Sequence, residues 1–379
     1  MALVNQFRQI LCGIALSALA MAPAVAARDN YATDSDYEGL AVAIDRDLPD
    51  FPRQKRRWTQ EAWVRLSYVV TADGQAVDPI VINSSGGIDF ENEVRKVTER
   101  WRFKPSDTGA ELPYNIANMR FVIRGRGKGT TRKFARYAKH IMKNLHGNNV
   151  EVARRHADEA VEIGGWNLYE STMLWLMLGR IEGAEGNDAG KLEMYRRGLA
   201  VSDSRSLRRN ARIDLLEDIF ELESKLHQYA AAMVTLETLS DVRGSSEVLE
   251  HLSARSAAIV EILDNQDVVA AQATVSNPCN CDEGVALWDY IPIRRTFSFA
   301  NLNGNVERFE ARCERQRISG VVETDQKWTL AADWGNCQVF VFGDDGATFD
   351  FLGHLPDSEE DQAIDRTAVA RNYVLDRRD

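Results

Sequence analysis

Hydrophobic and polar residues alternate over residues 63–70, and this period of two predicts a β-strand. The pair Asp73-Gly74 follows closely, and Asp-Gly between two β-rich runs is a strong hairpin signal. Residues 77–82 are therefore expected to return as a second strand. Serine and glycine at residues 84–87 interrupt this strand. The pattern predicts an antiparallel hairpin at the start of a folded unit.

A helix is expected after the hairpin, because hydrophobic residues recur at three- and four-residue spacing up to Trp101. Asp89 stands where it can cap the start of this helix, and Pro105 and Gly109 follow its end. Residues 119–124 are a further apolar run that favours a strand. The order strand, strand, helix, strand predicts a small α+β unit with one helix on one face of an antiparallel sheet.

The hydrophobic period is helical from residue 131 to about residue 271. Three segments in this region share a turn and then small or aromatic residues on one face, and they align at Ala153, Lys191 and Ala232. Trp175, Leu178 and Gly179 have a spacing that resembles tetratricopeptide repeats. Residues 130–271 are therefore expected to form degenerate helical repeats of this kind, and the alternative is an irregular helical bundle. Either arrangement usually holds partners or other domains.

The residues after Asn277-Pro278 have the pattern of a small antiparallel β-domain. Asn303-Gly304 and Asp345-Gly346 lie between β-rich runs and predict hairpins. We expect this domain to occupy residues 279–355 and a charged, helical tail to follow at residues 356–379. The predicted fold class is thus multidomain α+β: a small α/β sandwich, an all-α repeat region and a C-terminal β-domain.

The first 26 residues have the pattern of a secretory signal peptide. Arg8 supplies the positive charge, residues 10–22 are apolar, and Ala24-Val25-Ala26 is a small-residue cleavage box. Cleavage near Ala26 would release the chain into the bacterial periplasm. The alternative is an uncleaved signal that anchors the chain in the inner membrane, because the apolar run is close to the lower length limit of a membrane span.

Cysteine usage agrees with export. One of the five cysteines, Cys12, lies in the leader, and the others cluster near the C-terminus as Cys279, Cys281, Cys313 and Cys337. An even, clustered set in an exported chain predicts disulfides, although sequence alone permits three pairings. Bonding of Cys313 to Cys337 is expected, because each lies in or beside a predicted strand and those strands can be neighbours. Cys279 and Cys281 would then pair with each other or stay free.

The N-terminal unit resembles the C-terminal domain of the TonB family of energy transducers over residues 48–125. The resemblance rests on Phe51-Pro52, the Val-rich strand with its Asp-Gly turn, and the motif Trp-Arg-Phe-Lys-Pro at residues 101–105. The chain departs from the family in two features. About twenty residues, not a long Pro-rich spacer, separate leader and domain, and no histidine precedes His140.

The resemblance implies a mode of binding. In that family an extended segment of a partner adds as a further strand to an open sheet edge, where backbone N–H and C=O groups are unpaired. The resemblance places this edge at residues 116–123, with Phe51-Pro52 beside the bound segment. The implied partner-binding residues are Phe51, Pro52, Ile116, Asn118, Arg120 and Val122. The alternative is that another domain or a second copy covers the edge.

Charge narrows the class of partner. The net charge of −11 argues against nucleic acid as the main partner. The stretch from Arg124 to Lys139 nevertheless carries seven basic residues and no acid, which suits a solvated hinge or a contact with lipid or cell wall. No nucleotide, hydrolase or metalloprotease motif is present. Cys279-Asn280-Cys281 could be a redox pair or half of a zinc site, but Cys-x-x-Cys is more typical of redox sites, and only His251 and His354 could complete a zinc site, so structural disulfides are favoured.

The sequence thus predicts a periplasmic, non-enzymatic binding protein without metal, cofactor or evident small-molecule substrate. Its expected partners are envelope proteins such as an outer-membrane transporter, held by strand addition and by the helical repeats. This function could link the protein to TonB-dependent transport across the outer membrane. The alternatives are an envelope maintenance factor that contacts cell wall or lipid and, less favoured, an enzyme with a site in the β-domain.

Overall fold

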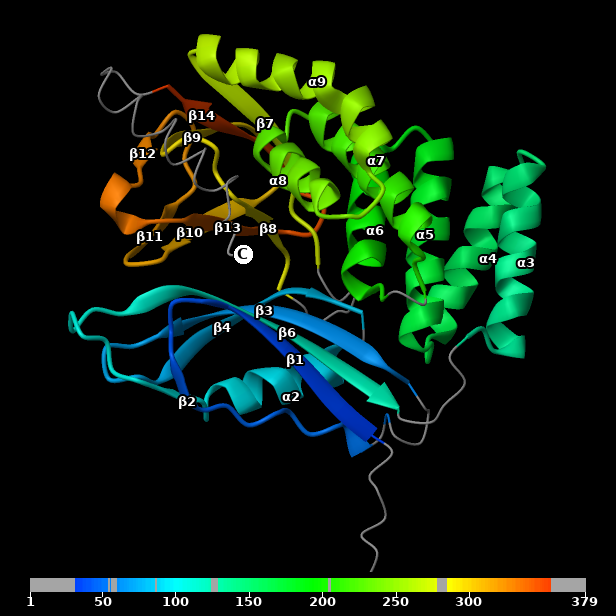
Figure 1. The fold of residues 1–379 in the computed structure, drawn as a ribbon, viewed down its shortest axis with the longest axis horizontal. Coiled ribbons are helices and arrows are strands. Elements are labelled where there is room, and N and C mark those ends of the chain that lie inside the picture. Colours follow the sequence, from blue (N-terminus) through cyan, green and yellow to red (C-terminus); the bar gives the residue numbers. More distant parts are fainter. Residues whose placement is uncertain are drawn as a thin grey trace, which may run out of the picture. The chain divides into compact units, whose positions relative to one another are not determined.

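The computed structural model describes residues 31–355, apart from residues 54, 56–59, 86, 124–128, 204–205 and 278–284. Figure 1 shows an N-terminal sheet, a run of helices and a C-terminal β-region in chain order. The predicted signal peptide, the predicted helical tail, and Cys279 and Cys281 lie outside the described residues. Within the described part of the chain, no helix is long and apolar enough to span a bilayer.

The N-terminal unit contains the predicted hairpin, helix and strand. The hairpin is β3 (Ala62–Val70) and β4 (Ala76–Ser84), the helix is α2 (Ile88–Thr98), and the last strand is β6 (Leu112–Ile123). The buried residues Phe90, Val94 and Val97 lie one helical turn apart in α2, and they form one core cluster with the sheet. Trp101 is fully buried there, and its indole Nε1 donates to the carbonyl of Asp47 at 2.8 Å.

Three further strands belong to this unit that the hydrophobic pattern did not reveal. They are β1 (Tyr31–Gly39), β2 (Ala43–Asp45) and β5 (Arg102–Phe103). β1 joins the main sheet, whose order is β1-β6-β3-β4, and β2 pairs with β5 in a separate two-stranded sheet. The short segment expected only to separate leader and domain is therefore partly built into the sheet.

Helices α3 to α9 occupy the region predicted to be helical. Their bounds are α3 Arg132–His146, α4 Val150–Ile163, α5 Leu168–Ala184, α6 Asp188–Val201, α7 Arg209–Lys225, α8 Tyr229–Ser240 and α9 Ser246–Asn265. A complete capping box fixes the start of α5: the Asn167 side chain accepts from the N–H of Glu170, and the Glu170 carboxylate accepts from the N–H of Asn167. On α4, Ala153, Ala157 and Ala160 are fully buried, which gives this helix a flat face for close packing.

The three aligned segments fall on α4, α6 and α8. The residue before each helix cap has a positive φ: 56° at Asn148, 81° at Gly186 and 57° at His227. These positions lie equally far before Ala153, Lys191 and Ala232, so the predicted common turn is present three times. The helical hairpins are confirmed as helices and turns, and their assignment to the tetratricopeptide class stays a prediction.

The C-terminal region is built from two antiparallel sheets of four strands, with orders β11-β10-β13-β8 and β12-β9-β14-β7. The bounds are β7 Val268–Thr274, β8 Leu287–Tyr290, β9 Thr296–Asn303, β10 Val306–Cys313, β11 Arg317–Val321, β12 Trp328–Thr329, β13 Cys337–Gly343 and β14 Thr348–His354, with the 3₁₀ turn η1 at Ala332–Trp334. β7 begins ahead of the predicted start at residue 279, in residues whose pattern we interpreted as helical. It pairs with β14 along its whole length.

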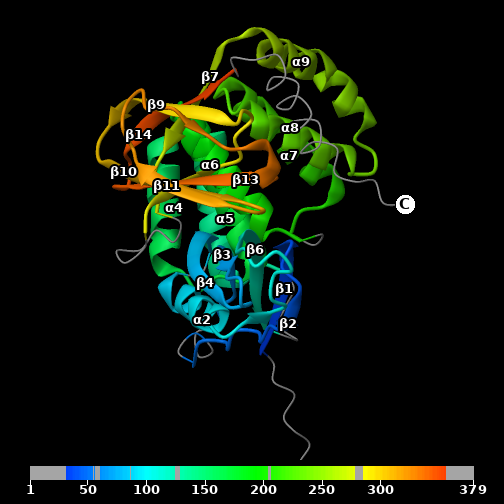
Figure 2. The same ribbon diagram turned by 90° about the vertical axis from the view of Figure 1, so that its left-hand side faces the viewer.

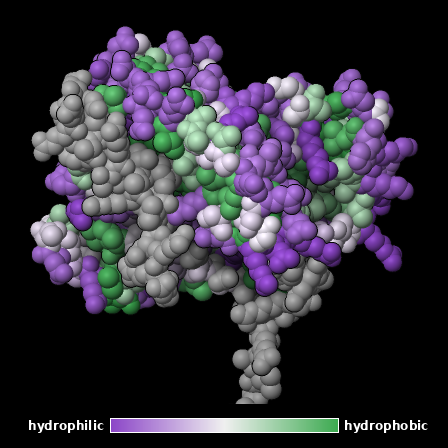
Figure 3. Space-filling view, turned by 45° about the horizontal axis from the view of Figure 1, so that its top comes forward, coloured by the Kyte–Doolittle hydropathy of each residue, from purple (hydrophilic) through white to green (hydrophobic). Residues whose placement is uncertain are grey.

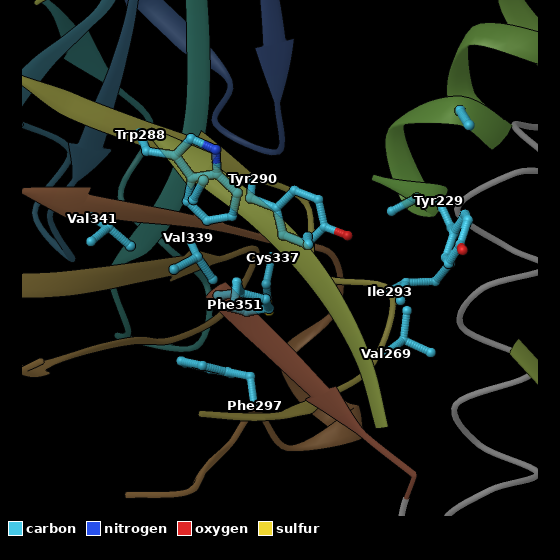
Figure 4. Close-up of a cluster of buried hydrophobic side chains, with 14 of the residues drawn as sticks. Tyr229, Val269, Trp288, Tyr290, Ile293, Phe297, Cys337, Val339, Val341 and Phe351 are labelled. Atoms are coloured by element: carbon cyan, nitrogen blue, oxygen red, sulfur yellow. The ribbon is translucent and has the colours of Figure 1, made fainter. Parts of the chain in front are cut away.

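Aromatic side chains from both C-terminal sheets share one core. Figure 4 shows Trp288 and Tyr290 of β8, Phe297 of β9 and Phe351 of β14 gathered beside Val339 and Val341 of β13. The rings of Phe297 and Phe351 stack with centroids 4.9 Å apart. The same cluster continues into α7 to α9, so helices and sheets are held by shared apolar burial.

The predicted disulfide is present. Cys313 ends β10 and Cys337 begins β13, and the two residues face each other as register partners of adjacent antiparallel strands. Both side chains are buried. The bond closes a loop with a sequence separation of 24, and closure of such a loop is worth about 3 kcal/mol in the chain-entropy treatment.

Candidate functional site

Strand β6 is the predicted binding strand, and it is not an edge. β1 pairs with it in antiparallel register over nine residue pairs, from Tyr31↔Ile123 to Gly39↔Asn115. β3 pairs with its other side. The prediction of an open edge at residues 116–123 is therefore wrong, because the chain's own N-terminal strand occupies that edge. The alternative, a covered edge, is the arrangement found, although the cover comes from a segment that was not expected to be a strand.

The predicted β6 residues share one face of the sheet because they alternate along the strand. The opposite face carries Ala117, Met119 and Phe121, which are buried in the core with α2. Ile116 is also fully buried, packed in a cluster with Phe340 and Phe342 of β13. Val122 is half-buried near the end of the strand.

Phe51 and Pro52 are both buried, so they are not exposed to a bound segment. The ring of Phe51 packs edge-to-face on Phe90 of α2 and Phe121 of β6, with centroids 5.6 Å and 5.9 Å away. Phe51 is thus part of the core beneath the sheet. Its contact with Phe121 gives it a structural role in holding β6, and a partner-binding role for this pair stays a prediction.

Asn118 and Arg120 line a pocket of about 420 Å³ on the face of the sheet away from α2. Trp63 and Arg65 of β3 contribute to the same wall, and Ser35 comes from β1. The far wall is the end of α6, from Leu199 to Ser202, together with Arg212 of α7. Arg120 donates to the carbonyl oxygens of Ala200 and Ser202 at 3.4 Å and 3.1 Å, which fixes its guanidinium across the pocket.

Sequence reasoning missed the basic character of this pocket. Arg65, Arg120 and Arg212 come from β3, β6 and α7, and no spacing in the sequence brings them together. Only the alternation along β3 and β6 could have shown that Arg65, Asn118 and Arg120 share a face. Even with that signal, the prediction would have required knowledge of how β3 and β6 are aligned, with Arg65 paired to Asn118.

The same face of the sheet is covered elsewhere by the C-terminal domain. Figure 2 shows the N-terminal sheet with α2 on one side and β11 and β13 on the other. Arg312 of β10 is fully buried and donates to Ser67 Oγ at 3.0 Å and to the Asp78 carbonyl at 2.9 Å. Glu310 pairs with it at 2.7 Å. Burial lowers the pKa of Arg312, and the charge of Glu310 opposes that shift.

Part of the predicted basic stretch lies on α3. Arg132, Lys133, Arg136 and Lys139 are exposed there, while Arg124, Arg126 and Lys128 lie outside the described residues. The Lys133 ammonium is 5.3 Å from the centre of the Trp166 ring. Among the residues that the structure describes, no group of three or more His, Cys, Asp or Glu side chains could hold a metal ion.

Comparison with known proteins supports the resemblance of the N-terminal unit. Residues 47–123 match the family model of the Gram-negative bacterial TonB protein C-terminal. This segment is therefore similar to TonB C-terminal domains. The strands β3, β4 and β6 and the helix α2 all lie inside the matched range, whereas β1 precedes it.

The relatives match over about a quarter of this chain or less. Protein TonB of Escherichia coli is 28% identical over 83 residues, which is 22% of this chain and 34% of that protein. Protein TonB of Pseudomonas aeruginosa is 30% identical over 91 residues, 24% of this chain and 25% of that protein. The chain thus spans about a third or less of the curated relatives that it matches. The solution structure of the Pseudomonas aeruginosa TonB CTD is 28% identical, with coverage of 25% of this chain and 92% of that one and a TM-score of 0.19.

Proposed function

We propose that this protein acts by binding in the bacterial envelope, and that its TonB-like domain captures an extended segment of a partner protein on strand β6. The partner class that the family implies is an outer-membrane transporter or another envelope protein, which would connect the chain to TonB-dependent transport. Export by a cleaved leader into the periplasm is part of the proposal. Binding, not catalysis, is the proposed activity, and no cofactor is required.

The observation that carries the proposal is the pairing of β1 with β6. A short segment from outside the matched range docks along β6 over nine register pairs, so this edge accepts an extended, antiparallel chain. A partner segment would form the same backbone hydrogen bonds. We propose that it takes the place of β1, because β6 has no other open side: β3 occupies the second one.

The helical hairpins are proposed to hold a second protein. They are consecutive, and exposed charges lie on α7 at Arg209, Asp214, Asp218 and Lys225 and on α5 at Arg180, which suits a polar contact surface. The face of the molecule in Figure 3 is mostly hydrophilic, with hydrophobic side chains in small separate groups. Such a surface fits a reversible contact better than a permanent apolar interface.

Deletion of residues 31–39 tests the proposal. The chain from Ala27 to Asp379 and its deletion variant would be titrated by calorimetry with synthetic peptides from the periplasmic N-terminal segments of outer-membrane transporters. If a partner replaces β1, the deletion removes a competitor and the same peptide should bind more tightly. The peptide YATDSDYEG, which is β1 itself, should also bind the deletion variant, and a scrambled peptide of equal composition should not.

Two results would contradict the proposal. If the β1 peptide binds the deletion variant but none of the transporter peptides binds it, β6 only holds the chain's own strand β1 and is not a partner site. If the transporter peptides bind the parent and lose affinity on deletion, the partner pairs with the outer side of β1. Circular dichroism of the deletion variant is the necessary control, because loss of β1 also removes a strand from the sheet.

A second candidate is an envelope maintenance role through the basic face of α3. The exposed residues Arg132, Lys133, Arg136 and Lys139 favour it, because clustered cations on one helix attract anionic polymers or lipid head groups. Cosedimentation with purified cell wall would support this function if replacement of Arg132, Arg136 and Lys139 by glutamine abolished it. Equal cosedimentation of the variant and the parent would exclude it.

A further inference from the structure

Three guanidinium groups converge on the pocket between the TonB-like sheet and the helices. Arg65 extends from β3, Arg120 from β6 and Arg212 from the first turns of α7, and all three line the same cavity of about 420 Å³. The named lining contains no aspartate or glutamate. In a chain with a net charge of −11, such a cavity is a local concentration of positive charge that attracts anions.

The ion pairs among the side chains that the structure describes do not include these arginines. Among the carboxylates whose side chains the structure describes, none lies within ion-pair distance of any of the three. The bonds of Arg120 go to backbone carbonyls, which leaves other N–H donors of its fork available. The Nε of Arg65 is buried without a hydrogen-bond partner in the described structure.

In the register of β1 and β6, Asp34 stands opposite Arg120 and Asp36 opposite Asn118, whereas Asp289 approaches from β8. Asp289 of β8 interacts electrostatically with Arg65, and its carboxylate accepts a hydrogen bond from the Gln338 amide at 2.8 Å. It does not line the pocket. Arg120 and Arg212 line the cavity together, and Asn118 adds a neutral amide beside them.

We propose that this pocket binds the phosphate group of a phosphorylated ligand. Guanidinium forks match the oxygens of phosphate, and three converging cations match a dianion better than the single charge of one carboxylate. The cavity is within the size range of small-molecule sites, so it holds more of the ligand than the phosphate. Leu199, Ala200 and Trp63 offer an apolar wall for that remainder.

The proposal does not rest on partner binding on β6, because the pocket is complete with β1 in place and includes Ser35 of that strand. It also gives a function to the arginine-lined pocket, which strand addition on β6 does not use. The sheet face at Arg65 and Arg120 is polar and open, whereas the same face at Ile116 is sealed against β13. The end of α6 and the start of α7 complete the site, so phosphate binding belongs to the whole chain and not to the TonB-like domain alone.

Calorimetric titration of the chain from Ala27 to Asp379 with inorganic phosphate and with pyrophosphate tests the site. The decisive variant is Arg212→Gln, since the Arg212 side chain has no hydrogen bond or ion pair to lose within the described residues. Its matched control is Arg209→Gln, which removes an exposed charge one turn earlier on the same helix. We expect Arg212→Gln to weaken binding by about tenfold or more and Arg209→Gln to leave it nearly unchanged.

The two sources of a phosphate group are separated by a second arm. Sedimentation with vesicles of phosphatidic acid in phosphatidylcholine, lost on Arg212→Gln, supports the site with a lipid as the ligand. Phosphate binding in solution without vesicle binding supports the site with a soluble ligand. The proposal is overturned if the parent binds neither probe, or if both arginine variants weaken binding equally, which would show attraction by general charge. The melting temperature of each variant checks that the fold is retained.

Discussion

At the scale of single residues, the TonB-like domain buries a carboxylate. Glu91 lies in the first turn of α2 with its side chain fully buried. Arg95 pairs with one of its oxygens at 3.2 Å, while the other oxygen, Oε1, is buried without a partner in the described structure. Burial raises the pKa of Glu91 above 4.5, although Arg95 and Ser84 oppose the shift. The charged form of Glu91 is therefore a cost to the folded state at neutral pH.

We predict that Glu91→Gln changes how stability depends on pH. The folded state of the parent takes up a proton at Glu91 at a higher pH than the unfolded state, whose pKa is near 4.5. As the pH falls from neutral toward 4.5, the parent should gain stability relative to the glutamine variant, which has no proton to take up. Urea denaturation at several pH values measures the difference in the free energy of unfolding.

Glu93→Gln is the control, because it removes one carboxylate from the same helix at a half-buried position. If the free energies of unfolding of the parent and of Glu91→Gln differ by the same amount at pH 7 and at pH 4.5, that result would contradict a raised pKa of Glu91. If the parent instead loses stability relative to Glu91→Gln over this range, the pKa of Glu91 is lowered in the folded state and not raised.

At the scale of elements, the hairpin of α5 and α6 depends on a glycine. A β-carbon at Gly179 would overlap the ring carbons of Tyr195, which is buried on α6. Gly183 lies one turn later and is exposed, and a β-carbon there would meet only the flexible side chain of Lys191 at 3.0 Å. The two positions thus separate helix propensity from packing between the helices.

We predict opposite effects for Gly179→Ala and Gly183→Ala. Alanine should favour the helix at both positions by up to about 1 kcal/mol. At Gly179 the overlap with Tyr195 should outweigh this gain and destabilise the protein by about 1–3 kcal/mol, as overpacked cores do. Thermal denaturation of both variants measures the contrast. If Gly179→Ala is as stable as Gly183→Ala, the close approach of α5 and α6 is not a packing constraint.

The elements also show where the sequence is informative. β3, β4, α2 and the C-terminal hairpins follow from alternation, from Asp-Gly or Asn-Gly turns and from helical spacing, because each is specified by its own residues. β1 could not be predicted in this way. Its sequence YATDSDYEG has few apolar residues, and it is a strand because β6 offers it hydrogen-bonding partners. β7, with its sequence VVAAQAT, is ambiguous between helix and strand until β14 pairs with it.

The candidate site shows the same limit. The resemblance placed the candidate site on β6 and on residues that alternate along it, and their role in partner binding stays a prediction. It could not reveal that Ile116 is sealed by Phe340 and Phe342, or that Arg212 lies across the pocket, since these contacts join residues more than ninety positions apart in the sequence. Contacts of this kind depend on the packing of one domain against another, and no local pattern records them.

At the scale of the whole molecule, the side chains on the two faces of β13 belong to two different hydrophobic cores, and the strand connects them. Val339 and Val341 point into the core of the C-terminal sheets, while Phe340 and Phe342 pack with Ile82 and Ile116 of the TonB-like sheet. Polar contacts surround this second cluster: Arg317 pairs with Asp78 at 2.6 Å and with Glu111 at 2.9 Å. The TonB-like domain is thus held by its neighbour through a buried, apolar contact.

This contact predicts cooperative unfolding of the described part of the chain. The parent should unfold in one transition, because separation of the two sheets would expose Ile116 and Phe340, which are both fully buried. Phe340→Glu would place a charge in that contact and leave the core of the C-terminal sheets intact, so the two units should unfold in separate transitions by calorimetry. Val339→Ala is the matched control: it should lower the melting temperature by weakening the other face of β13 while a single transition remains. If Phe340→Glu still unfolds in one transition, or the parent already unfolds in two, the shared contact does not couple the domains. The TonB-like domain would then be expected to move as an independent module, with its β6 face open along its whole length.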